Sequence, residues 1–135
     1  MPAKVVYSDI INYLDMIDGQ SLGSFNAKHG TWWYNSDGST PITYAEFTTG
    51  NVPNVSYQGQ PVPIMNTKDP VQSNFYLVLI RAGGIPASNN KQMPKDGPYI
   101  TDPGWTGVNN NNVQLSGKQV MDAIEWWLSN GFPEK

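Results

Sequence analysis

Apolar residues recur at helical spacing in four separate parts of the chain. The apolar residues that follow Ser8 in the chain predict a helix over about 9–17, with Ser8 as its N-cap. Thr43 and Glu46 form a capping-box pattern, which predicts a short second helix that stops before Gly50. The apolar positions of the first helix are Ile10, Ile11, Leu14 and Ile17.

Two further helices are predicted in the second half of the chain. Asp69 followed by Pro70 is typical of an N-cap and a first helical residue, which predicts a helix over Val71–Arg81. Ser116 and Gln119 form a second capping box at the start of the last helix. Its apolar face consists of Val120, Ile124, Trp127 and Leu128.

The two adjacent tryptophans of this last helix have different environments in the prediction. Trp127 lies on the apolar face, whereas Trp126 is rotated by about 100° around the helix axis. We therefore expect Trp127 to be buried between the terminal helices and Trp126 to be more exposed.

Outside these four helices, the apolar residues have no regular spacing along the chain. Two long stretches, Leu22–Ile42 and Arg81–Leu115, are rich in Gly, Pro, Asn and aromatic residues. Loops this long are uncommon in a compact domain unless they wrap something or have a function. Isolated strands are possible around 62–65 and 30–34, but sustained alternation is absent. The pattern favours a mainly α domain, with a β-sandwich as the less favoured alternative.

Composition and charge narrow the function classes. A chain of 135 residues suits one domain, residues 1–135. Only 14% of residues are charged and the net charge is −3, which suits a polar but weakly charged contact surface. Nucleic acid and anionic membrane surfaces are not expected partners, because no basic face is available to bind phosphates.

The chain has no cysteine and a single histidine, His29. Disulfides, thiolate metal sites and a cysteine nucleophile are therefore excluded, and a metal site is not expected. Residues 1–20 contain no long apolar run after a basic start, so no signal peptide is predicted. On this interpretation the protein is made in the cytoplasm.

Several motifs follow one another along nearly the whole chain. After the first predicted helix come Thr43–Phe47, then Asp69–Tyr76, then Met93–Pro98, and finally a helix end over Trp126–Pro133. In order and spacing these motifs resemble the class I cytochrome c domains of bacteria. The resemblance implies a small α-helical domain whose terminal helices pack across each other, with Met93 in the place of the distal axial ligand.

The chain departs from that family at the haem-attachment motif C-x-x-C-H. The equivalent positions are Ile17–Ser21 or, if His29 is taken as the reference, Phe25–His29, where Phe25 and Lys28 replace the cysteines. Covalent haem is therefore not expected, and no cofactor is predicted. His29 and Met93 remain weak candidates for a non-covalent haem.

Catalysis is not expected. Acyl transfer would have to use His29, and no G-x-S-x-G pattern is present. The segment Asn35–Gly38 has a partial calcium-loop pattern, but position 12 of such a loop is Tyr44 and not Glu, so a turn is favoured. The carboxylates considered as acid–base candidates mostly fall at predicted caps and turns: Asp37, Glu46, Asp69, Asp96 and Asp102.

Aromatic residues outside the predicted helices allow two interpretations. In the first interpretation, the aromatic rings fill the space that haem would occupy. At least two of Trp32, Trp33, Tyr99 and Trp105 would then point inward beside Met93. Alternatively they bind a partner. We favour filling for most rings. The partner-binding candidates are Trp32, Trp33, Tyr34, Tyr57 and Trp105.

These observations favour a non-catalytic structural or interaction protein on a degenerate cytochrome c-like fold. One protein class that fits is a virion protein that decorates a phage capsid, or another assembly subunit. We expect such a protein to self-assemble or to bind a protein partner. The alternatives are a module that binds a glycan or small ligand through loop Trp and Tyr side chains, and a carrier of non-covalent haem.

Overall fold

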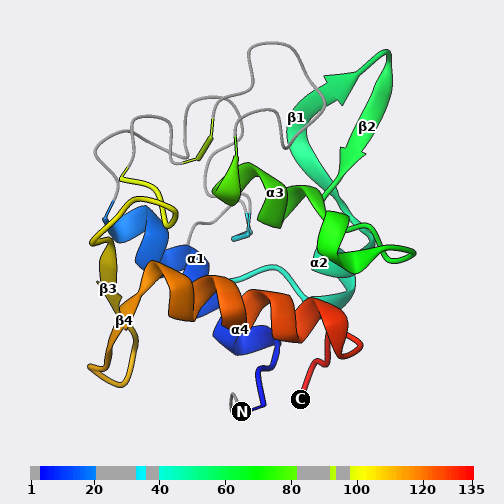
Figure 1. Ribbon diagram of the computed structural model, residues 1–135. Helices are drawn as coiled ribbons and strands as arrows, with labels where there is room; N and C mark the ends of the chain where they lie inside the picture. The colour runs from blue at the N-terminus through cyan, green and yellow to red at the C-terminus, as the bar shows by residue number, and fades with distance from the viewer. Residues whose placement is uncertain (1–3, 21–32, 36–39, 82–91, 94–97) are drawn as a thin grey trace.

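The computed structural model describes residues 4–20, 33–35, 40–81, 92–93 and 98–135. His29, Trp32, Asp37 and Asp96 lie outside these ranges. In chain order the elements are α1 (Tyr7–Gly19), α2 (Tyr44–Thr49), β1 (Asn51–Tyr57), β2 (Gln60–Pro63), the 3-10 helix η1 (Pro70–Gln72), α3 (Asn74–Ile80), β3 (Thr106–Val108), β4 (Gln114–Ser116) and α4 (Gly117–Ser129). Figure 1 shows α4 crossing in front of α1, with the two strand pairs on opposite sides of the molecule.

The expectation of a mainly α domain is wrong, because the described residues form a mixed α/β structure with 42% helix and 16% strand. β1 pairs with β2 and β3 pairs with β4, each as a separate antiparallel sheet. β3 and β4 are three residues long, too short for a sequence alternation to be visible. β1 carries a proline and a register irregularity, which removes regular alternation there as well.

α1 has the predicted buried face but not the predicted cap. The N-cap is Val6, and its backbone N–H donates to the Asp9 carboxylate at 2.9 Å, so Ser8 already lies inside the first turn. The prediction of Ser8 as N-cap is wrong because the acceptor at the third helical position, Asp9, fixes an earlier start. The buried residues are Ile10, Ile11, Leu14, Met16 and Ile17.

The predicted helix over residues 71–81 is divided in two. η1 and α3 are separated by Ser73, whose backbone is extended, and Asp69 makes no side-chain cap bond. The Ser73 side chain is fully buried, and its hydroxyl accepts a hydrogen bond from the Asn66 N–H at 2.9 Å. This local hydrogen bond favours the break, because a serine hydroxyl competes with the helical backbone for partners.

The capping boxes of α2 and α4 are both confirmed. Thr43 accepts from the N–H of Glu46, whose carboxylate accepts from the N–H of Thr43. Ser116 and Gln119 exchange the equivalent bonds at the start of α4. Such reciprocal bonds satisfy two backbone donors that a helix start would otherwise leave unpaired.

Trp127 is fully buried, as predicted, and Trp126 is half-buried. The Trp127 ring makes edge contacts with Phe47 of α2 and Phe75 of α3, with centroids 6.2 Å away in both cases. Phe132, which follows α4, makes a third such contact at 6.0 Å. Edge-on ring packing joins three helices and the C-terminal segment around one side chain.

Two aromatic rings from outside the helices are also buried, as expected. The Trp33 side chain is fully buried and Trp105 is 5% exposed, and both belong to the main core. Tyr99 and Met93 are half-buried. No helix in the described ranges is long and apolar enough to cross a membrane.

Candidate functional site

A shallow groove of about 280 Å³ opens between the second half of α1 and the β3–β4 hairpin. Four of its eight lining residues carry a side-chain amide, one carries a carboxylate and one a thioether. The lining residues are Asn12, Asp15, Met16, Gly19, Gln20, Val108, Asn109 and Asn110. The Asn12 side-chain carbonyl accepts a hydrogen bond from the Asn110 N–H at 3.2 Å, which ties the hairpin turn to α1.

Asp15 forms the polar centre behind this groove. One carboxylate oxygen accepts from the Trp33 indole N–H and the other from the Tyr34 hydroxyl, both at 2.8 Å. Burial, followed by the hydrogen bond to Asp15 and the charges of Asp15 and Asp18, raises the pKa of Tyr34 to about 12. Burial and the charge of Asp15 also raise the pKa of Asp18. Because both oxygens of Asp15 already accept hydrogen bonds, the residue anchors two aromatic rings and is not a free acid or base.

The β3–β4 hairpin carries exposed apolar side chains. Val108 is 53% exposed and Val113 is 50% exposed. Val108 pairs with Gln114 and the next bonded position joins Asn109 to Val113, so the two valines point to opposite faces of the hairpin. The hairpin therefore presents an apolar side chain on each face.

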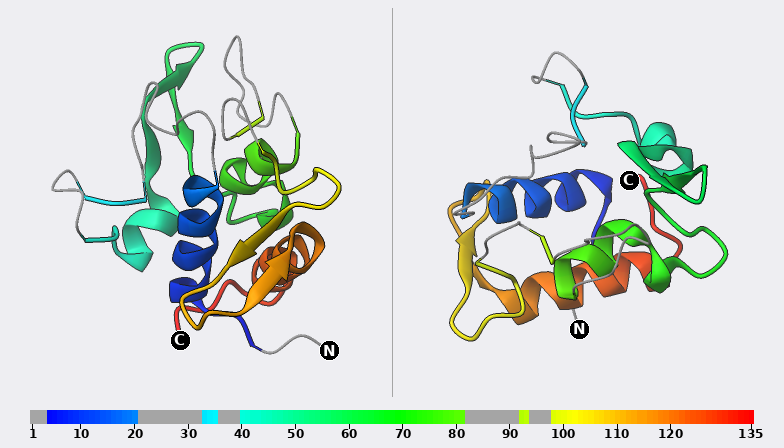
Figure 2. Two further views of the ribbon diagram at one scale, coloured as in Figure 1. Left: turned by 90° about the vertical axis from the view of Figure 1, so that its left-hand side faces the viewer. Right: turned by 90° about the horizontal axis from the view of Figure 1, so that it is seen from above.

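The outer edge of β4 is open at Gln114, whereas the outward N–H of Ser116 donates to the Gln119 side chain at 2.8 Å. Two backbone hydrogen bonds show which opposite residues of this ladder are bonded to each other. The Gly117 N–H donates to Trp105 C=O, and the Asn109 N–H donates to Val113 C=O. Because such pairs alternate in an antiparallel ladder, the N–H and C=O of Gln114 point away from β3. Neither group has a hydrogen-bond partner among the described residues. β3 lies between α1 and β4 (Figure 2, left), so the unpaired edge of the hairpin is that of β4.

The β1–β2 hairpin extends from the other side of the molecule (Figure 1). At its tip Tyr57 is 44% exposed, and Gln58 and Gly59 both have positive φ, at 51° and 78°. Two consecutive residues of this kind form the turn that suits the twist of a hairpin. β2 contains Pro61 and Pro63, which lack an N–H, so its edge offers few donors to another strand.

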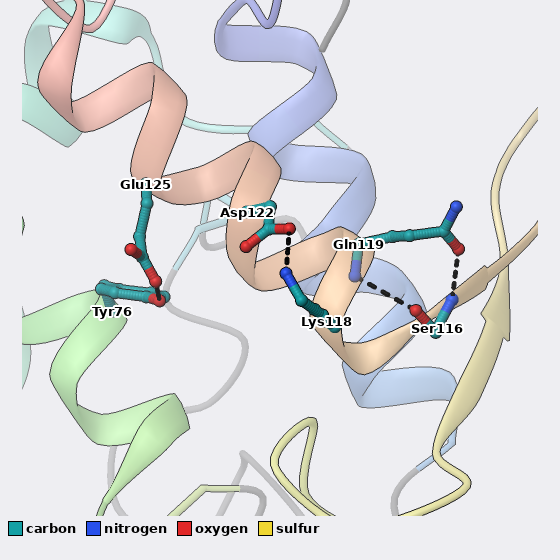
Figure 3. Close-up of polar contacts among 6 residues, drawn as sticks. All are labelled: Tyr76, Ser116, Lys118, Gln119, Asp122 and Glu125. Carbon is teal, nitrogen blue, oxygen red and sulfur yellow. Dashed lines mark hydrogen bonds and ion pairs between the residues drawn. The ribbon is translucent and has the colours of Figure 1, made fainter. Parts of the chain in front are cut away.

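The outward face of α4 carries a separate set of polar contacts, shown in Figure 3. Lys118 and Asp122 form an exposed ion pair at 2.8 Å. The Tyr76 hydroxyl donates to the Glu125 carboxylate and so joins α3 to α4. Burial and this hydrogen bond, with the charges of Glu125 and Asp122, raise the pKa of Tyr76. The contact ties two helices, and no nucleophile–base pair accompanies it among these residues.

The residues singled out from the sequence do not converge on one place. Trp33 and Trp105 are in the core, Tyr34 is half-buried beside Asp15, and Tyr57 is exposed on a different hairpin. Met93 is half-buried and its N–H donates to Val78 C=O at 2.8 Å. Trp32 and His29 lie outside the described residues.

Of the carboxylates weighed for acid–base chemistry, Glu46 and Asp102 serve local structure, whereas Asp69 makes no side-chain cap bond. Glu46 closes the α2 capping box, and Asp102 accepts from the Tyr99 N–H at 2.8 Å. Within the described ranges, no three His, Asp or Glu side chains gather in a metal-binding group.

Asp15 and the two valines were not among the residues predicted from the sequence. A buried tryptophan indicates that an acceptor lies near its indole N–H, but the sequence does not show which residue supplies it. The valines gave no signal, because their exposure depends on a hairpin that the sequence did not predict. No family model, curated protein or solved structure matches this chain.

Proposed function

We propose that this chain is a non-catalytic assembly subunit, and that its β3–β4 hairpin binds the same hairpin of a second copy. The observation that carries the proposal is the pair of half-exposed valines, Val108 and Val113, on a hairpin with an open strand edge. Apolar side chains on both faces of a projecting element are typical of a surface that a partner covers. A subunit of a virion or of another particle is a setting that this property suits.

Charge supports a second copy as the partner. From Pro103 to Gly117 the chain contains no charged residue, so two copies of the hairpin meet without like-charge repulsion. Natural edge strands are usually protected by charges or prolines, and β4 has neither. A three-residue strand supplies few hydrogen bonds, so the valines would provide most of the apolar contact area.

The contact would be two-fold symmetric. Two β4 strands that pair antiparallel around Gln114 exchange bonds between the N–H of one copy and the C=O of the other. The sheet would then have four strands, and both open edges would be satisfied.

Sedimentation velocity across a concentration series tests the proposal. We expect the wild-type chain to self-associate, and expect Val113→Asp to weaken the association at least tenfold, because it places a charge at the centre of the contact. Gln114→Pro should have a similar effect by removing the outward N–H. Circular dichroism of each variant checks that the fold is intact.

Two matched variants complete the experiment. Gln72→Asp adds the same charge at an exposed position outside both hairpins, and Tyr57→Asp adds it at the tip of the other hairpin. Both should associate like the wild type. A wild-type chain that stays monomeric at every concentration would refute self-assembly. Loss of association in Tyr57→Asp alone would move the contact to the β1–β2 hairpin.

The amide-lined groove favours a second candidate, a small neutral ligand such as a sugar. Its volume of about 280 Å³ lies just below the usual range for ligand pockets, and the amides of Asn12, Gln20 and Asn109 suit hydroxyl groups. Titration of monosaccharides while observing backbone amide signals tests it. Shifts confined to α1 and the β3–β4 hairpin would support this candidate, and an unchanged spectrum would exclude it for the sugars used.

A further inference from the structure

The segment that follows α4, residues 131–133, is held against the core by a set of contacts that we call the C-terminal clasp. The clasp is formed by Gly131, Phe132 and Pro133 with Trp127 and Tyr44. The Phe132 N–H donates to Trp127 C=O at 2.8 Å, and the Trp127 indole N–H donates to Pro133 C=O at 2.9 Å. The Tyr44 hydroxyl donates to Phe132 C=O at 2.6 Å. These contacts connect the chain end to the core.

The clasp holds an uncommon backbone conformation. Gly131 has φ of 82°, and Phe132 also has a positive φ, at 38°. A bulky residue rarely adopts positive φ unless its surroundings impose it. The hydrogen bonds on both sides of the Phe132 backbone and the ring contact with Trp127 impose it here.

Asn130 directly precedes the clasp and is the only asparagine in the sequence that is followed by glycine. Its side chain is exposed, and its amide N–H donates to Trp126 C=O at 2.7 Å. The Gly131 N–H has no hydrogen-bond partner among the described residues. An ideal Cβ built on Gly131 would meet nothing within 4 Å, so the space around this peptide is open. The attacking Gly131 nitrogen is therefore accessible and makes no other hydrogen bond among the described residues, whereas the amide nitrogen that would leave Asn130 donates to Trp126 C=O.

We propose that Asn130 is a site of spontaneous deamidation and that the reaction opens the C-terminal clasp. The Gly131 backbone nitrogen loses its proton and attacks the side-chain carbonyl carbon of Asn130. A new carbon–nitrogen bond closes a five-membered imide, the bond to the side-chain nitrogen breaks, and that nitrogen leaves as ammonia with the proton. Water then opens the imide at either carbonyl, giving aspartate or isoaspartate.

Glycine is the residue that best permits this ring closure. Closing the ring requires rotation of the peptide that joins the two residues, and a glycine without Cβ accepts that rotation most readily. The four asparagines in the turn of the β3–β4 hairpin, Asn109–Asn112, are each followed by Asn or Val. The side chains of these following residues hinder the ring closure. Asn130 should therefore react before they do.

The isoaspartate product is incompatible with the clasp. It adds one carbon to the main chain between positions 130 and 131, which moves Phe132 away from the partners that hold its positive φ. The product also replaces the amide donor to Trp126 C=O by a carboxylate at the C-terminal end of α4, where negative charge is unfavourable. Trp127 then loses the acceptor of its indole N–H.

Incubation of the full chain in mildly alkaline buffer tests both parts of the proposal. Peptide mapping, with fragmentation that separates isoaspartate from aspartate, should find the product first at Asn130. Hydrogen exchange of the Trp127 indole N–H, followed by NMR, should be at least tenfold faster in the isolated isoaspartate form than in the starting protein.

Two variants provide matched controls. Asn130→Gln keeps the amide but cannot close the five-membered ring readily, so its clasp should stay intact during the same incubation. Asn130→Asp introduces the charge without the extra main-chain carbon, and should change indole exchange less than isoaspartate does. Reaction at Asn130 no faster than at Asn109–Asn112 would refute the site. Unchanged indole exchange in the isoaspartate form would refute the opening of the clasp.

Discussion

Buried tryptophans in this protein differ in what their indole N–H groups meet. Trp33 donates to Asp15, and Trp127 donates to Pro133 C=O. The indole nitrogen of Trp105 is buried without a hydrogen-bond partner among the described residues. Leaving a buried donor unpaired costs about 1–3 kcal/mol, so Trp105 stabilises the fold through its apolar area alone.

A pair of Trp→Phe substitutions separates the apolar contribution from the hydrogen bond. Trp127→Phe should lower the free energy of unfolding by about 1 kcal/mol more than Trp105→Phe does, because only Trp127 loses a hydrogen bond. Urea unfolding followed by circular dichroism gives both values. Both substitutions remove the same part of the indole ring, so each is the volume control for the other. An equal loss in the two variants would show that the Trp105 N–H has a partner in solution.

Burial of these rings could be predicted from the sequence, but their hydrogen bonds could not. Trp127 falls on the apolar face of a well-patterned helix, so its position follows from local spacing. The acceptor for Trp33 is on α1, 18 positions away in the chain. A contact of that separation depends on how the elements pack, and a single sequence contains no local signal for it.

At the scale of the elements, helix starts are fixed by side chains that accept backbone hydrogen bonds. Ser116 has this role in α4, whereas Ser8 is already inside α1. Ser116→Ala should lower the free energy of unfolding by about 1 kcal/mol. Ser8→Ala should leave it unchanged or raise it by up to about 0.5 kcal/mol, because alanine is the better helix former. Thermal and urea unfolding of both variants measure the contrast. A larger loss at Ser8 than at Ser116 would contradict the observed helix starts.

The helices were easier to predict than the hairpins for a physical reason. A helix makes its hydrogen bonds within one segment, so caps such as Thr43 and Ser116 are visible in the sequence. β1 and β2 are held by a turn in which Gln58 adopts positive φ, and glutamine gives no warning of that conformation. Only part of the strand content that makes the fold mixed α/β was therefore predicted: the possible strand around 62–65 overlaps β2, whereas β1, β3 and β4 were not predicted.

At the scale of the whole molecule, tyrosine hydroxyls connect segments that are far apart in the chain. Tyr7 donates to Ile42 C=O at 2.6 Å, Tyr34 to Asp15, Tyr44 to Phe132 C=O and Tyr76 to Glu125. Burial is the largest cause of a raised pKa in all four. Each hydroxyl donates its proton to an acceptor, so the folded state favours the protonated phenol.

These raised pKa values predict the pH dependence of stability at alkaline pH. Below the ordinary tyrosine pKa of 10.0 the phenols are protonated in both the folded and the unfolded chain, so they add no slope. Above it the unfolded chain loses protons that the folded chain keeps, so stability falls as pH rises, and for Tyr34 the fall extends to about pH 12. Urea midpoints measured across this range should decrease steadily.

Tyr34→Phe isolates one contribution to this fall. The variant should have a shallower decrease than the wild type, because one phenol no longer titrates. Tyr57→Phe, at the exposed tip of the β1–β2 hairpin, is the matched substitution outside the core. A wild-type midpoint that does not change above pH 10 would show that these hydroxyls do not hold their protons in the folded state.

The ring cluster around Trp127 has a consequence for the order of events in folding. Phe47, Phe75 and Trp127 come from three helices, and Tyr44 reaches Phe132 across 88 positions of the chain. Hairpins close within about 1–10 μs, whereas contacts of long sequence separation must first overcome the entropy of closing a large loop. We therefore expect the two hairpins to form early, and the cooperative barrier to be crossed when the C-terminal helix meets the segment that begins at Tyr44. Substitutions in the ring cluster should report on that barrier through the folding rate.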